Sequence, residues 1–69
     1  MINVNQADRY QILRLPDVMK MTGLSRSTIY VAISQDVFPK QVHLGPRSVG
    51  WLKREIDEWV KQRIEISRN

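Results

Sequence analysis

Apolar residues recur at helical spacing in three separate stretches of this 69-residue chain. In the first stretch, Leu15, Val18 and Met21 share one face of a predicted helix of about two turns. The proline and aspartate directly after Leu15 are typical of a helix start, because proline tolerates the first turn and a carboxylate favours the positive end of the helix dipole. Gly23 is expected to end this helix.

A second helix is predicted directly after Gly23. Glycine adopts a positive φ at no steric cost, which allows a sharp turn, and Ser25 is a favoured N-cap residue. Leu24 before the cap can pack on Ile29 as a hydrophobic staple. Helical spacing places Ile29, Ala32 and Ile33 on the inward face and Ser27, Tyr30, Val31 and Ser34 on the outward face. Two short helices joined so briefly indicate a helix-turn-helix, with an ordinary capped surface helix as the alternative.

A short β-hairpin is predicted after the second helix. Residues 35–40 are expected to end that helix, because the residue before Pro39 is disfavoured in the α region, and Phe38 is expected to plug the core. Polar and apolar residues then alternate on both sides of a turn at residues 45–47. The alternation predicts an exposed His43 and Arg47 near the tip and an inward set of Val42, Leu44, Val49 and Trp51. Such a flap after a helix-turn-helix is a wing, and residues 9–14 are expected to form an extended lead-in.

The third helical stretch runs from residue 53 to about residue 67. Its apolar face is formed by Ile56, Trp59, Val60 and Ile64. Trp51 and Trp59 fit inward-facing positions and are interpreted as core anchors. Stacking platforms for nucleic-acid bases are the alternative for these two rings.

The length of the chain allows one small domain with a modest core. The expected organisation is a loose arm at residues 1–8, the domain at residues 9–66 and a tail at residues 67–69. The net charge is +4, and between Lys20 and Arg54 six basic residues face Asp36 alone, a balance of +5. Positive charge around a helix-turn-helix is typical of a surface that meets a polyanion, with a plain solvated surface as the alternative.

The sequence argues against catalysis, cofactors and membranes. It has no cysteine, and its one histidine, His43, has no neighbouring metal ligands or nucleophile. We therefore expect no metal, no cofactor and no enzymatic activity. The apolar runs are short, and the first residues lack the basic and apolar regions of a signal peptide. We expect a cytoplasmic protein without a membrane partner.

Five blocks of the sequence together resemble the AlpA family of prophage regulatory proteins, small relatives of phage excisionases and of MerR-type winged-helix domains. The blocks are Leu13–Val18, Thr22–Tyr30, Phe38–Lys40, Leu44–Trp51 and Glu55–Trp59. The resemblance, which extends from about residue 13 to residue 63, implies a mostly α fold with a small β-hairpin, the winged helix-turn-helix. It also implies binding to double-stranded DNA beside phage or genomic-island genes, as a transcriptional regulator, as a recombination directionality factor (excisionase), or as both.

Matched to the family, the recognition helix falls on residues 25–34 and the wing tip on residues 45–47. The candidate DNA contacts are Ser25, Arg26, Ser27, Thr28, Tyr30, Val31, Lys40, His43, Pro46 and Arg47. Arg26 would contact either guanine O6 and N7 or a phosphate, and Arg47 would enter the minor groove. Thr28 and Val31 would contact thymine methyl groups, and Tyr30 would contact the DNA backbone. Lys40 and His43 would contact phosphates, with a plain solvated surface as the alternative for both.

A domain this small offers DNA only one short helix and one wing. We therefore expect several copies to load cooperatively on repeated promoter or attachment-site sequences, and the protein to be associated with the nucleoid. The competing hypothesis is a protein-binding adaptor that uses the helix-turn-helix as a scaffold and contacts an integrase or another regulator. Its support in the sequence is limited to three candidate exposed apolar residues, Val31, Val37 and Ile66.

Overall fold

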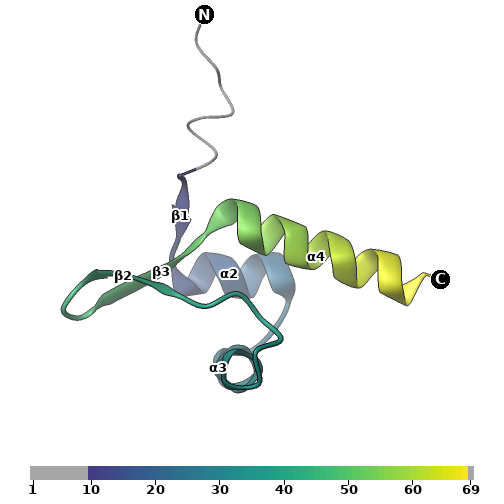
Figure 1. Ribbon diagram of the computed structural model, residues 1–69, viewed down its shortest axis with the longest axis horizontal. Helices are drawn as coiled ribbons and strands as arrows, with labels where there is room; N and C mark the ends of the chain where they lie inside the picture. The colour runs from purple at the N-terminus through teal and green to yellow at the C-terminus, as the bar shows by residue number, and fades with distance from the viewer. Residues whose placement is uncertain (1–9, 69) are drawn as a thin grey trace, which may run out of the picture.

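The computed structural model describes residues 10–68, so the predicted arm at residues 1–8 and the last residue of the predicted tail lie outside the described residues. Its elements are β1 (Ile12–Leu13), α2 (Leu15–Thr22), α3 (Arg26–Ser34), β2 (Val42–Gly45), β3 (Ser48–Leu52) and α4 (Lys53–Ser67). Helices α2 and α3 form the helix-turn-helix, and β2 and β3 form the wing. The wing and the C-terminal half of α4 project from opposite sides of the body (Figure 1). The predicted winged helix-turn-helix is therefore confirmed.

The helix-turn-helix begins and ends where the local chemistry predicts. Helix α2 has Pro16 in its first turn, and its C-cap Gly23 has a φ of 74° and donates its N–H to the Met19 carbonyl oxygen at 2.8 Å. Only glycine adopts this left-handed conformation without a Cβ penalty, so the chain turns here. Ser25 then caps α3 by accepting a hydrogen bond from the Thr28 N–H, as predicted.

The end of α3 lies where it was predicted but has a different cause. The N–H of Asp36 donates to the Ile33 carbonyl and the N–H of Val37 donates to the Ala32 carbonyl, both at 3.0 Å. These two bonds form a Schellman motif, in which Asp36 takes the left-handed position with a φ of 59°. The helix is thus closed by its own cap, and Pro39 lies beyond the stop.

In the part of the chain that the structure describes, the sheet has three strands, whereas only a hairpin was predicted. Strand β1 pairs antiparallel with β3, with Ile12 opposite Leu52 and Leu13 opposite Trp51, and the strand order is β1-β3-β2. Part of the extended lead-in expected at residues 9–14, namely Ile12–Leu13, is therefore a third strand, and residue 9 lies outside the described residues. Because β1 pairs at the end of β3 that enters α4, it holds the root of the wing against the body.

One face of the sheet packs on the core. Trp51 is fully buried, its partner Leu13 is 6% exposed, and Val49, two residues before Trp51, packs partly buried on the same cluster. Residues directly opposite each other in an antiparallel pair share a face, so His43, opposite Val49, lies on the core side of the wing. Its side chain is still exposed, because the wing projects beyond the helices (Figure 1).

The prediction that Val42 and Leu44 point inward with Val49 and Trp51 is wrong. Val42 lies opposite Gly50, which puts it on the other face of the sheet. Leu44 is 48% exposed, and its Cδ1 lies 3.3 Å from the position that a Cβ on Gly50 would occupy. Alternation sets which residues share a face within one strand, but the register between strands decides which face meets the core. That register divides the predicted inward set between two faces.

The core consists of Leu13, Val18, Ile29, Phe38, Trp51 and Ile56. The predicted burial of Phe38 and Trp51 is confirmed, and Trp59 packs partly buried against the same cluster. Ile64, predicted on the apolar face of α4, is 48% exposed, because α4 continues past the helix α2 on which it packs (Figure 1). Within residues 10–68, no helix has the length and apolar character needed to cross a membrane.

Candidate nucleic-acid interface

The start of α3 carries a network of exposed hydroxyl groups. Ser25 Oγ accepts a hydrogen bond from the Thr28 N–H at 3.2 Å, donates to Thr28 Oγ1 at 2.9 Å, and lies 3.4 Å from Ser27 Oγ. Because the single hydroxyl hydrogen of Ser25 is directed to Thr28 Oγ1, Ser27 is the donor in its contact with Ser25 Oγ. The hydroxyl hydrogen left for an external acceptor is therefore that of Thr28.

Arg26 lies over the ring of Tyr30. Its guanidinium carbon is 5.7 Å from the ring centroid, within the range of a cation–π contact, and the side chain is exposed. Tyr30 was predicted to face outward, but it is only partly exposed, because its ring packs edge-on against Trp51 with centroids 6.3 Å apart. The ring of Tyr30 thus supports Arg26 and connects it to the core.

The remaining residues of α3 divide into the two predicted faces. Ile29 is fully buried, and Ala32 and Ile33 pack partly buried against the core. On the opposite face Val31 is 53% exposed, and the Ser34 hydroxyl donates to the Val31 carbonyl at 2.6 Å. Burial of one face fixes the helix, and the other face stays free for contact.

The tip of the wing is formed by Pro46 and Arg47, both exposed in the turn between β2 and β3. The wing is held at its base by Trp51, whose indole N–H donates to the Pro39 carbonyl oxygen at 3.1 Å. Since the same ring contacts Tyr30, the wing and α3 are connected through one buried side chain. Sequence reasoning identified Trp51 as a core residue but not as this connection.

Lys40 has a partner that the sequence analysis did not consider. Its Nζ lies 3.3 Å from Asp36 Oδ1, and the two side chains are 72% and 77% exposed. The i,i+4 spacing was visible in the sequence, but the residues lie beyond the helix, where that spacing predicts no contact. An exposed pair of this kind contributes little, so a phosphate can replace the carboxylate. Among the described residues, no ion pair involves Arg26, His43 or Arg47.

The structure gathers the helix candidates more tightly than the wing candidates. One shallow hollow at the start of α3 is lined by Ser25, Arg26, Ser27 and Tyr30. This hollow combines an exposed guanidinium with hydroxyl groups and the first N–H groups of a helix, which together suit an anionic oxygen. The wing candidates, His43, Pro46 and Arg47, lie along a separate projection.

Comparison with known proteins relates the chain to a phage-associated group. The profile of the family described as "Prophage CP4-57 regulatory protein (AlpA)" matches residues 11–64. The DNA-binding transcriptional activator AlpA of Escherichia coli (strain K12) is 42% identical over 69 residues, covering 91% of this chain and 99% of that protein. The uncharacterized protein ORF88 of Enterobacteria phage P4 is 50% identical over 54 residues, covering 78% of this chain and 61% of that protein.

Proposed function

Because the chain belongs to the AlpA family of prophage regulatory proteins, we propose that it is a transcriptional regulator that binds double-stranded DNA through its winged helix-turn-helix. The observation that carries the proposal is the exposed start of α3. There Arg26 packs on the ring of Tyr30, beside the hydroxyl groups of the N-cap network. A relative that is 42% identical over most of both chains is named as a DNA-binding transcriptional activator, which agrees with this use of the surface.

In the proposed complex, the N-terminal half of α3 enters the major groove. The free N–H groups and the Thr28 hydroxyl meet a phosphate, since a helix start attracts anions, and the Ser27 hydroxyl can join them by leaving Ser25 Oγ. Arg26 reaches a guanine, where a guanidinium pairs with O6 and N7 at once. The exposed methyl groups of Thr28 and Val31 suit the methyl group of thymine. The ring of Tyr30 mainly supports Arg26, and the Tyr30 hydroxyl contacts the DNA backbone.

The wing supplies the second contact in this proposal. Arg47 at its tip enters the adjacent minor groove, where the negative potential is highest if the groove is narrow, and Pro46 stiffens the turn that carries it. Lys40 and His43 face phosphates. Lys40 exchanges its exposed partner Asp36 for the DNA backbone.

The proposal extends to recombination. The phage P4 relative supports a role on a mobile element, where the same DNA contact would serve as a recombination directionality factor beside an integrase. Several copies would load side by side on repeated promoter or attachment-site sequences, because a single domain of this size covers little DNA. Deleting the gene and measuring both the flanking transcripts and the excised circle by quantitative PCR separates the two roles.

Binding is tested by fluorescence anisotropy on DNA fragments from beside the gene. Arg26→Ala and Arg47→Ala are each expected to weaken binding by about 1–3 kcal/mol, or about 5- to 150-fold, if they contact bases. Arg68→Ala is the matched control, because it removes the same charge from the exposed end of α4. If the control loses as much affinity as the other two, binding depends on net charge alone and the docking mode is wrong.

A further inference from the structure

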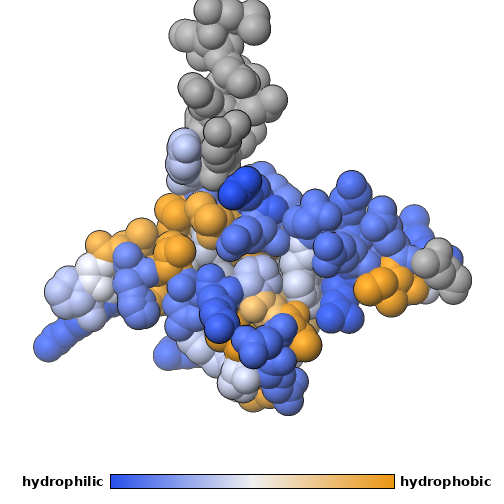
Figure 2. Space-filling view, in the orientation of Figure 1, coloured by the Kyte–Doolittle hydropathy of each residue, from blue (hydrophilic) through white to orange (hydrophobic). Residues whose placement is uncertain are grey.

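Helix α3 is attached to the body along one narrow side. Its one buried side chain is that of Ile29, with Ala32 and Ile33 partly buried beside it and Tyr30 in edge contact with Trp51. In the view of Figure 2, apolar surface gathers over the base of the wing and on the far half of α4, with only small apolar patches in the region of α3. The backbones of α2, α4 and β3 pack closely on one another, whereas the backbone of α3 approaches them at only a few points. A helix held so narrowly needs further contacts to fix its direction.

A threonine outside α3 holds its start. The hydroxyl of Thr22, the last residue of α2, donates to the Val18 carbonyl oxygen at 2.8 Å and accepts the N–H of Leu24 at 3.2 Å. One hydroxyl group therefore joins α2 to the residue before the N-cap Ser25. Thr22 and Leu24 are partly buried, and the Leu24 side chain packs on the core. Because the bond to Leu24 spans Gly23, it fixes the turn where the backbone has its greatest freedom.

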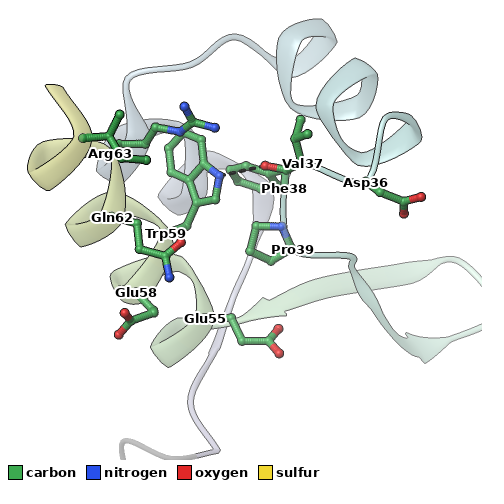
Figure 3. Close-up of a pocket in the computed structure, with 10 residues that line it drawn as sticks. Asp36, Val37, Phe38, Pro39, Glu55, Glu58, Trp59, Gln62 and Arg63 are labelled. Carbon is green, nitrogen blue, oxygen red and sulfur yellow. Dashed lines mark hydrogen bonds between the residues drawn. The ribbon is translucent and has the colours of Figure 1, made fainter.

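A tryptophan of α4 holds the other end of α3. The indole N–H of Trp59 donates to the Val37 carbonyl oxygen at 2.9 Å (Figure 3), and the Val37 N–H closes the Schellman motif on Ala32. The Trp59 ring packs edge-on against Phe38 with centroids 4.9 Å apart, and the guanidinium carbon of Arg63 lies 5.1 Å from its centroid. The indole is therefore held in one orientation, with its N–H directed at the residue that closes α3.

The two bonds connect α3 to a single frame. Thr22 belongs to α2 and Trp59 to α4, and these two helices pack against each other. Helix α3 has nine residues and is about 14 Å long, so it is held near both ends by a side chain from outside it. A recognition site needs its side chains placed within about 0.5 Å, so a shift of about 1 Å at either end of this helix exceeds that tolerance.

We propose that Thr22 and Trp59 are positioning residues for DNA recognition, which set the direction of α3 through the backbone of Leu24 and Val37. This inference rests on the proposed DNA binding and adds two residues that touch no DNA in that complex. Phosphate contacts adapt to a small tilt of the helix, because charge attraction is weakly directional, whereas base contacts depend on direction. Loss of either bond is therefore expected to lower the preference for one sequence more than the affinity for DNA in general.

The first test measures the direction of α3 without DNA. Backbone N–H residual dipolar couplings are recorded for the full chain and for two variants that remove one bond each, Thr22→Val and Trp59→Phe. In the unmodified chain, the couplings of α2, α3 and α4 are expected to fit one alignment tensor. In each variant the couplings of α3 no longer fit with those of α2 and α4. Thr22→Ser, which keeps the hydroxyl group, restores the common fit.

The second test measures sequence preference by fluorescence anisotropy. The Kd for a random-sequence duplex is divided by the Kd for a fragment of equal length from beside the gene. This ratio is expected to fall about five-fold or more in Thr22→Val and Trp59→Phe, the effect of losing one base contact, and to recover in Thr22→Ser. Ile56→Val is the control, because it removes a methyl group from the buried core and lowers stability but leaves both bonds in place. Its couplings and its ratio stay unchanged.

The two measurements separate the possible failures. Couplings of α3 that stay unchanged in Thr22→Val and Trp59→Phe, or a ratio that falls as far in Ile56→Val, would overturn the inference. If Trp59→Phe does not fold, the pair of Thr22→Val and Thr22→Ser decides. If the unmodified chain binds neither duplex, the proposed function falls. A clear sequence preference that neither bond-removing variant reduces removes the inference alone.

Discussion

Gly50 is the position where the structure predicts that one added methyl group disrupts the fold. A Cβ built on Gly50 would overlap Cγ2 of Ile12, and it would lie 3.0 Å from the Leu13 carbonyl oxygen and 3.3 Å from Leu44 Cδ1. The first obstacle is a methyl group attached directly to a branched Cβ, and the second is backbone. Neither can move away as the end of a flexible side chain would, so Gly50→Ala must push β1 from β3.

The magnitude follows from two opposing effects. Overpacking a closely packed site costs about 1–3 kcal/mol, while replacing glycine by alanine restricts the unfolded chain and gains about 0.4–1 kcal/mol. We therefore expect Gly50→Ala to lower the free energy of unfolding by about 1.5 kcal/mol, which corresponds to a fall in Tm of about 6–12 °C for a domain of this size. Against a total of roughly 3–10 kcal/mol for this length, that loss is large.

The assay is urea and thermal unfolding followed by circular dichroism, with Gly45→Ala as the matched control. A Cβ on Gly45 meets nothing within 4 Å and its φ is not positive, so only the gain in the unfolded state remains. The control is expected to be neutral or slightly more stable. Adding Ile12→Ala should recover part of the loss caused by Gly50→Ala, as a positive coupling in a double-mutant cycle. Equal stabilities of the two alanine variants would refute this account of the sheet.

Three further substitutions test local features by urea denaturation. Ser25→Ala removes the cap of α3 and is expected to cost about 1 kcal/mol, with Ser25→Gly costing only a few tenths; equal losses would argue against the cap. Asp36→Gly relieves a left-handed aspartate and is expected to stabilise by about 0.5 kcal/mol, since its exposed pair with Lys40 contributes little; a loss of stability would contradict this. Trp51→Phe leaves the Pro39 carbonyl without its indole donor and should cost about 1–3 kcal/mol; an unchanged midpoint would show that the bond is not needed.

Features set by neighbouring residues were predictable from the sequence. The turn at Gly23, the cap at Ser25 and the buried face around Ile29 depend on contacts within a few residues, and the structure has all three. The order of helix, helix, wing and helix followed from periodicity and was confirmed. The exposure of Arg26 and Arg47 agrees with the predicted surface, while their contact with DNA stays a prediction.

Features set by pairing between distant segments were not predictable in the same way. The face of Leu44 depends on the register of β2 against β3, and that register includes an irregularity between residues 43 and 45. Likewise the pairing of Ile12 with Leu52 joins segments forty residues apart, and no local pattern specifies it. The partial burial of Tyr30 follows from the position of Trp51, which only the folded chain provides.

Trp51 connects the wing to helix α3, and the proposed DNA interface depends on this connection. Its buried ring contacts Tyr30, which supports Arg26, and its strand continues from the wing tip that carries Arg47. A protein that reads DNA with a helix and a wing needs a fixed distance between them, because the grooves they enter have a fixed spacing. The indole bond to Pro39 also fixes the segment between α3 and β2. Weakening this connection would therefore reduce DNA affinity without removing any group that touches DNA.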